Sequence, residues 1–160
     1  MSPFAYIAIS ALCTGIAVQD LSQRMVHWFL FPLLGLVLAW QHYLHVGFQP
    51  FLASVILNLI LVNLVLGALF AYTRYIMKKK FLNTSFGAGD LLFFYAFALG
   101  YPTYTFLLLF TGAILFSALV YFIMIKRGDN TVPLAGLMGI FVMGATLASL
   151  WPNAPSLYLM

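Results

Sequence analysis

The chain has 160 residues, of which 64% are hydrophobic, 18% are aromatic and only 6% are charged. Soluble domains carry about 25% charged residues, so this composition excludes an ordinary water-facing surface. Several apolar stretches approach the length of about 20 residues that a helix needs to cross a bilayer, and they do not alternate as barrel strands do. We therefore predict an all-α polytopic membrane protein.

Six apolar segments follow one another along the chain, with Pro and Gly residues between them. Their ranges are 3–18, 27–44, 51–75, 90–99, 104–125 and 132–150. The fourth is the shortest, and it either begins near Phe86 or forms a half-length helix. The prediction is six transmembrane helices that form one membrane domain over residues 1–160.

The positive charges set the expected orientation. All seven Lys and Arg residues fall in alternate loops: Arg24 after the first segment, a cluster from Arg74 to Lys80 after the third, and Lys126 and Arg127 after the fifth. The positive-inside rule places these loops in the cytoplasm and both the N- and C-termini outside. The rule accounts for the net charge of +4 without a nucleic-acid partner. We expect a multi-pass protein of the cytoplasmic (inner) membrane, and no cleaved signal peptide, because the start lacks a positive region.

The chain has three acids, Asp20, Asp90 and Asp129. Asp129 lies in the polar stretch KRGDN, where a solvated turn residue is the simplest interpretation. Asp20 follows the first apolar segment and Asp90 opens the fourth, so both are expected at the cytoplasmic end of a helix. An aspartate in a membrane helix costs about 2.5–3.5 kcal/mol at the bilayer centre, and such residues usually face the protein interior and have a function.

Each of these two aspartates also has a structural interpretation. Asp90 would cap the N-terminus of its own helix, and Asp20 would pair with Arg24 four residues later. Together they suggest chemistry, because two carboxylates that share one site push one pKa upward. The ionised group can then take a proton from water while the protonated group polarises a carbonyl, as in aspartic proteases. A position at the interface would admit water while the substrate stays in lipid.

Two glycines, Gly87 and Gly89, precede Asp90 in the stretch GAGD. Glycine allows the close approach of a neighbouring backbone, and it allows a positive φ just before the helix. The simpler interpretation is ordinary loop chemistry at a helix entrance. The Gly-x-Gly-Asp pattern is short, and it gains meaning from the polytopic chain and from the second aspartate at the same depth.

The stretch VQDLSQRMV after the first segment, with FGAGD at the start of the fourth of six, resembles the type IV prepilin peptidases. These belong to the Gly-x-Gly-Asp intramembrane aspartic proteases, with presenilin and the archaeal preflagellin peptidases. The resemblance implies that Asp20 and Asp90 are the catalytic pair and that Gly87 and Gly89 form the motif of the second aspartate. It also implies that Arg24 is the basic residue that follows the first catalytic aspartate in this family. It also implies removal of short basic leaders from pilin-like single-span membrane proteins, without a metal or cofactor.

Two places in this chain depart from the family pattern. Residues 26–28 read Val-His-Trp where Ile-Pro-Asn is typical, and Leu92 stands where Lys is typical. These departures motivate one alternative, a catalytically silent relative that acts in membrane assembly. A proton-coupled transporter subunit is the other alternative, because paired aspartates in a membrane can carry protons. No acid lies deep in a predicted span, which disfavours the transporter.

Three histidines, His27, His42 and His45, lie outside this pattern. His42 and His45 are three residues apart, but a metal site needs three or four ligands, so an aromatic belt with Trp40 and Tyr43 is the simpler expectation. His27 is expected at the start of the second helix, with tuning of the aspartates as the lesser option.

Small and amide side chains within the segments are expected to serve packing. Asn58 and Asn63 in the third segment should hydrogen-bond to a neighbouring helix. Gly136, Gly139 and Gly144 in the sixth are spaced for close helix–helix contact.

Overall fold

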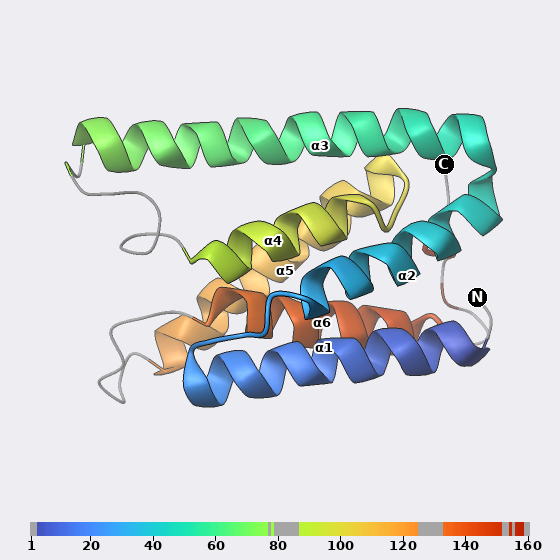
Figure 1. Cartoon of the computed structure of the whole chain (residues 1–160), viewed down its shortest axis with the longest axis horizontal. Coiled ribbons are helices and arrows are strands. Elements are labelled where there is room, and N and C mark those ends of the chain that lie inside the picture. Colours follow the sequence, from blue (N-terminus) through green and yellow to red (C-terminus); the bar gives the residue numbers. More distant parts are fainter. Residues whose placement is uncertain are drawn as a thin grey trace.

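The computed structural model describes residues 3–76, 78, 87–124, 133–151, 154 and 156–158. Over these residues the chain forms six α-helices and one short π-helical turn, and no strand (Figure 1). The elements are α1 (Pro3–Gln23), α2 (Leu30–Val46), α3 (Phe48–Ala71), η1 (Tyr72–Ile76), α4 (Ala88–Ala98), α5 (Thr103–Met124) and α6 (Leu134–Ala148). The basic residues Lys79, Lys80, Lys126 and Arg127, and the acid Asp129, lie outside the described residues.

Three of the helices are long and apolar enough to cross a membrane. Their candidate spans are Pro3–Gln23, Phe48–Tyr75 and Thr103–Ile123. The helices α2, α4 and α6 are also apolar but shorter, with 17, 11 and 15 residues. The 11 residues of α4 rise only about 16 Å, so the half-length alternative for the fourth segment is confirmed.

Consecutive helices run in opposite directions, with α1 and α3 along opposite edges of the molecule (Figure 1). The helix α6 packs against α1 and α5, while α4 packs against α2, α3 and α6. The end of α1 and the starts of α4 and α6 therefore lie at one end of the molecule (Figure 1). At the opposite end, the Tyr6 hydroxyl near the start of α1 lies 3.3 Å from the Ser149 hydroxyl after α6.

Two short turns follow from single residues. Gly47 joins α2 to α3 with φ of 81°, a conformation that glycine adopts without steric cost, and its N–H donates to the Tyr43 carbonyl at 2.9 Å. Pro102 precedes α5 and accepts a hydrogen bond from the Phe106 N–H at 2.8 Å. Proline suits this place because the first N–H groups of a helix have no partner within the helix.

Residues of all six helices form the core, which contains a group of aromatic side chains from α4, α5 and the turn between them. Phe97 is fully buried, and its ring centroid lies 5.6 Å from that of Tyr101 and 5.6 Å from that of Phe106. Large apolar side chains are also exposed on the outside, for example Leu64 at 65% and Ile123 at 73%. An outer surface of this kind suits contact with hydrocarbon rather than with water.

The helix ends differ from the apolar segments at the two places that matter for the aspartates. Helix α1 continues to Gln23, five residues beyond the predicted end at 18, so Asp20 lies within its last turns. Helix α4 begins at Ala88, so Asp90 is its third residue. The expected ends were wrong because loss of apolar character marks the edge of the hydrocarbon, whereas a helix continues through polar residues until its hydrogen bonding is interrupted.

Candidate functional site

Asp20 reaches from α1 to the start of α6. Its side chain is partly buried, and its Oδ2 accepts a hydrogen bond of 2.7 Å from the backbone N–H of Gly136. Gly136 is the third residue of α6, and the first N–H groups of a helix have no partner within the helix. The carboxylate of one helix therefore caps the N-terminus of another.

Asp90 reaches the same place from α4. Its Oδ1 accepts a hydrogen bond of 2.8 Å from the backbone N–H of Ala135, and its carboxylate also accepts one from the N–H of Gly87. The expected N-cap role of Asp90 was wrong, because Gly87 is the N-cap of α4 and Asp90 is its third residue. The carboxylate reaches back to the Gly87 N–H and across to α6, and the bond to α6 was not foreseen. Asp90 is also partly buried.

The two carboxylates are held on consecutive backbone amides of α6. An N-cap side chain ordinarily binds the second or third N–H of its helix, which in α6 belong to Ala135 and Gly136. Pro133, the residue at the N-cap position of α6, makes no such side-chain bond. Asp20 and Asp90 take its place from two other helices, where the positive end of the α6 dipole favours negative charge. They are close enough to interact electrostatically.

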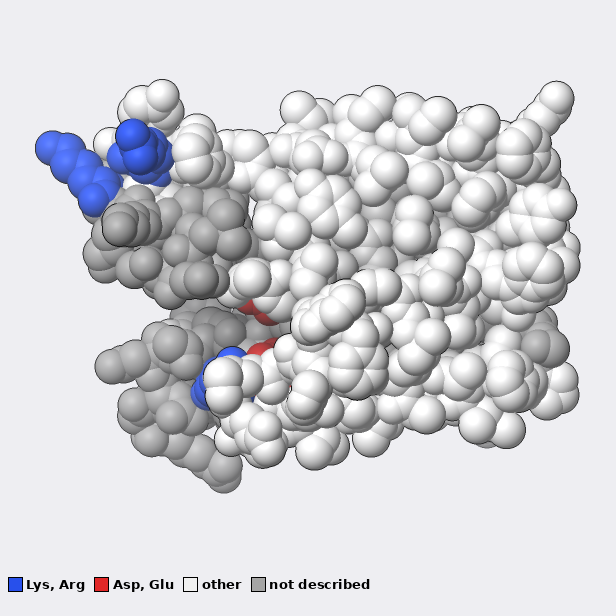
Figure 2. All heavy atoms as spheres, in the orientation of Figure 1, with Lys and Arg blue, Asp and Glu red and all other residues white. Residues whose placement is uncertain are grey.

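The two acids lie where the described positive charges also gather. Asp20 and Asp90 are the acids of the described residues, so the red atoms in Figure 2 are theirs. The red atoms show toward the same end of the molecule as the blue Lys and Arg atoms (Figure 2). The described basic residues are Arg24, Arg74 and Lys78.

Gly136 has no space for a side chain. A Cβ at this position would lie 3.0 Å from the Cβ of Asp20, 3.1 Å from its Oδ2 and 3.4 Å from the Cα of Ala17. Gly139, one turn later, faces the Cys13 carbonyl at 3.5 Å, so the expected close packing is confirmed at both glycines. It is wrong for Gly144, where a Cβ would meet nothing within 4 Å.

Of the two glycines before Asp90, Gly87 leaves space for the carboxylate, and it does so with ordinary backbone angles. Gly87 has φ of −72°, and Gly47 is the glycine with positive φ in the described part of the chain, so the expected positive φ before α4 was wrong. A Cβ on Gly87 would lie 2.8 Å from Oδ2 of Asp90, so a side chain at this position would displace the carboxylate. A Cβ on Gly89 would meet the Phe31 ring at an ordinary contact distance of 3.4 Å, so there is room for a side chain at this position.

Arg24 lies one residue past the end of α1, and its positive charge acts electrostatically on Asp20. Its backbone N–H donates to the Asp20 carbonyl at 3.2 Å, and its φ is 55°. A residue in this left-handed conformation ends the helix. The hydrogen bonds of His27 go to Gln19 rather than to an aspartate. Its backbone N–H and its Nδ1–H both donate to Oε1 of Gln19 at 2.9 Å.

The amides of Asn58 and Asn63 both bond to α4, as expected. Asn58 is fully buried and donates to the carbonyls of Ala98 at 3.0 Å and Tyr101 at 2.9 Å. Asn63 is exposed, and its Oδ1 accepts a bond of 3.0 Å from the Tyr95 hydroxyl. These bonds tie α3 to the half-length helix that carries Asp90.

The two histidines of α2 are held by carbonyl oxygens. His42 is fully buried and donates from Nδ1 to the Leu99 carbonyl at 3.0 Å, while His45 donates from Nδ1 to the Gln41 carbonyl at 2.7 Å. Trp40 and Tyr43 form a ring contact beside them at 6.1 Å. Within the described ranges, no three His, Cys, Asp or Glu side chains cluster as ligands of a metal ion would.

Sequence reasoning missed that the site depends on Ala135 and Gly136. These residues contribute backbone N–H groups, and a residue's type does not indicate whether its backbone N–H is free to bind a side chain. The available signal was Pro133 at the head of an apolar segment, because proline is typical of the start of a helix and marks where free N–H groups occur.

No protein-family model, no curated protein and no solved structure matches this chain.

Proposed function

We propose that the chain is an intramembrane aspartic endopeptidase in which Asp20 and Asp90 activate water. One observation supports this best: the two carboxylates bind the consecutive amides of Gly136 and Ala135 at 2.7 and 2.8 Å. Two acids from separate helices are thereby brought to one place, at the edge of an otherwise apolar chain. The resemblance to the type IV prepilin peptidases rests on the same two aspartates.

In the proposed arrangement all six helices belong to the membrane domain, and both chain termini lie outside. The described basic residues Arg24, Arg74 and Lys78 share the end of the molecule that holds the aspartates (Figure 2). The positive-inside rule then assigns this end to the cytoplasmic face of the inner membrane. Asp90, the third residue of the 11-residue α4, then lies near the cytoplasmic end of its helix.

The proposed chemistry divides the work between the two acids. The amides of α6 hold Oδ2 of Asp20 and Oδ1 of Asp90, which fixes the orientation of both groups. The ionised carboxylate takes a proton from water, and the resulting hydroxide attacks the peptide carbonyl carbon. The protonated carboxyl donates to the carbonyl oxygen, and a proton then passes to the leaving amine as the C–N bond breaks. This division of roles is that of the aspartic-protease pair.

The proposed substrates are pilin-like single-span membrane proteins with a short basic leader. Such a leader would lie at the cytoplasmic face, where Asp20 and Asp90 are partly buried but visible from outside (Figure 2). The helix that follows the leader would remain in lipid beside the chain. Cleavage at their junction requires the reacting groups at the interface, which is the position proposed for this site.

A structural role for the two aspartates is the second candidate. The same hydrogen bonds cap α6 from α1 and α4, so they would stabilise a catalytically silent assembly protein equally well. An N-cap bond is worth about 1 kcal/mol, so each aspartate would stabilise the fold without any chemistry. The two candidates differ in what an amide substitution would do, because asparagine keeps an oxygen that accepts the bond but cannot transfer the proton.

The test is N-terminal sequencing of the membrane proteome in cells that carry the native chain, Asp20→Asn or Asp90→Asn. Gly144→Ala is the control, because a Cβ there meets nothing within 4 Å. The proposal expects one or a few single-span proteins to keep a basic leader in both Asn variants and to lose it with the native chain and the control. If all N-termini are unchanged while the four proteins are equally abundant in the membrane, the structural role replaces it.

A further inference from the structure

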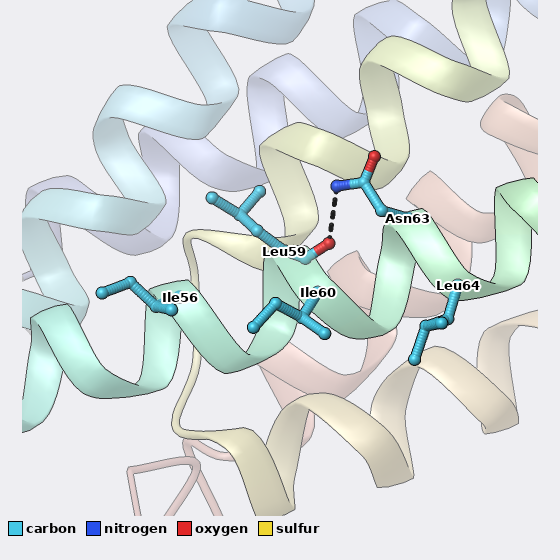
Figure 3. Close-up of a pocket in the computed structure, with 5 residues that line it drawn as sticks. All are labelled: Ile56, Leu59, Ile60, Asn63 and Leu64. Atoms are coloured by element: carbon cyan, nitrogen blue, oxygen red, sulfur yellow. Dashed lines mark hydrogen bonds between the residues drawn. The ribbon is translucent and has the colours of Figure 1, made fainter.

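Asn63 is a polar residue on a face of α3 that is otherwise apolar and open. It lines a shallow hollow of about 430 Å³ together with Ile56, Leu59, Ile60 and Leu64, all residues of α3 (Figure 3). Ile60 is 51% exposed and Leu64 is 65% exposed. The described chain therefore leaves this face of α3 uncovered around an amide.

The hydrogen bonds of Asn63 leave part of its capacity open. Its Nδ2 donates one bond, of 2.7 Å, to the Leu59 carbonyl of its own helix, and its Oδ1 accepts from Tyr95 (Figure 3 shows the first). Asn58, five residues earlier, instead gives both of its N–H groups to carbonyls at the end of α4. An amide has two N–H donors, so Asn63 has one more to give.

The depth of Asn63 argues against lipid as the partner of that donor. Asn63 is the sixteenth of the 24 residues of α3, so it lies about 22 Å from one end of the helix and about 12 Å from the other. In a membrane this position faces acyl chains, which offer no acceptor. A transmembrane helix can supply one from a polar side chain, and asparagine is a residue that associates helices in membranes.

The hollow also lies beside the helix that carries Asp90. Tyr95, whose hydroxyl bonds to Asn63, is five residues from Asp90 in α4, or about 7.5 Å of helix rise. Gly67 lies one turn from Asn63 along α3, toward the end of the molecule that holds the aspartates. A Cβ on Gly67 would meet no atom of the described residues within 4 Å, so another backbone can approach there.

We propose that this face of α3, around Asn63 and Gly67, is the docking surface for the transmembrane helix of the substrate. The identity of the occupant rests on the proposed function, and the surface itself rests on the hollow and the open donor of Asn63. A helix seated here places the junction with its cytoplasmic segment at the level of Asp90. Specificity would then lie partly in the helix of the substrate, through a polar acceptor opposite Asn63.

Binding can be measured without cleavage in the Asp90→Asn chain reconstituted in vesicles. A bimane label is placed at Ile60→Cys or, as a matched control, at Leu115→Cys, which is 60% exposed in a second hollow between α3 and α5. The native Cys13 is fully buried, so labelling is selective for the introduced cysteine. The probe is a synthetic peptide with two lysines before about 20 apolar residues, one serine within them and a nitroxide quencher.

The expected result is saturable quenching at Ile60→Cys and only weak, non-saturating quenching at Leu115→Cys. Asn63→Leu and Gly67→Ile should each weaken binding about threefold to tenfold. Gly67→Ile is the decisive variant, because the open space around it leaves the fold intact. Equal curves at the two labels, or unchanged affinity in both variants, would overturn the proposal.

Two other occupants have their own signatures. If nitroxide-labelled lipid quenches Ile60→Cys and the peptide does not displace it, the surface binds lipid. If added unlabelled chain prevents the peptide from quenching the bimane at Ile60→Cys, the surface joins two copies of the chain. Either result overturns a substrate site. Saturable peptide binding in a chain that cleaves nothing would instead retain the surface and reject the peptidase.

Discussion

The Cβ of Asp20 lies 3.0 Å from the position that a Cβ would take on Gly136. This contact is what allows the Gly136 N–H to donate to Oδ2 of the same aspartate at 2.7 Å. The close approach of α1 to α6 and the position of the Asp20 carboxylate therefore depend on the same contact. A change at Gly136 should alter both the stability and the proposed chemistry.

Gly136→Ala is expected to lower the free energy of unfolding by about 1–3 kcal/mol, because the added methyl group must displace the Asp20 side chain or the backbone at Ala17. It should also lower the proposed cleavage. Unfolding in detergent can be followed by maleimide labelling of Cys13, the single cysteine, which is fully buried. Gly144→Ala, in the open position of the same helix, should be neutral or slightly stabilising. Equal behaviour of the two alanines would contradict the contact.

Two substitutions of Asp90 distinguish its hydrogen bond to α6 from its proposed catalytic role. Asp90→Asn keeps an oxygen for the Ala135 N–H, so its stability should stay within about 1 kcal/mol of the native chain. Asp90→Leu removes the acceptor and should cost about 1–2 kcal/mol. Both variants should lack the proposed cleavage. Cys13 labelling in denaturant gives the stability, and a leader-cleavage assay gives the activity. Cleavage by the Asn variant would reject the assigned role of Asp90.

Asn58 should be the more important of the two asparagines for stability. Asn58→Leu leaves the buried carbonyls of Ala98 and Tyr101 without their donor, and we expect a loss of about 1–3 kcal/mol. Asn63→Leu should cost less than about 1 kcal/mol, because Asn63 is exposed and is tied to α4 only through the bond from the Tyr95 hydroxyl, its other bond lying within α3. Thermal unfolding in detergent ranks the two; the reverse order would show that the end of α4 is held in another way.

Arg24 ends α1 in a left-handed conformation, with φ of 55°. Asparagine tolerates this conformation, whereas a β-branched residue does not. Arg24→Val should therefore be less stable than Arg24→Asn by about 1 kcal/mol. Since both variants lose the guanidinium group, their difference reports the backbone alone. The comparison requires only the two unfolding curves, and identical curves would mean that the helix ends elsewhere in solution.

The all-helical class and the six α-helices of the described residues could be predicted from the sequence, because both depend on local composition. A run of apolar residues forms a helix in lipid whatever its neighbours are, since its backbone has no other way to satisfy its hydrogen bonds. The same reasoning identified Asp20 and Asp90 as the acids to explain. It placed the end of α1 too early, because helical hydrogen bonding continues past the last apolar residue to Gln23.

Only the tertiary structure decided what the two aspartates bind. Their partners are the N–H groups of Ala135 and Gly136, which are separated from Asp20 by more than a hundred residues. Whether such groups are free depends on where α6 begins, and whether a carboxylate reaches them depends on how closely α1 and α4 pack. Sequence determined the elements and the rare charges, since these are local properties. The meeting of two carboxylates at one helix end is a property of packing, which the order of residues does not reveal by itself.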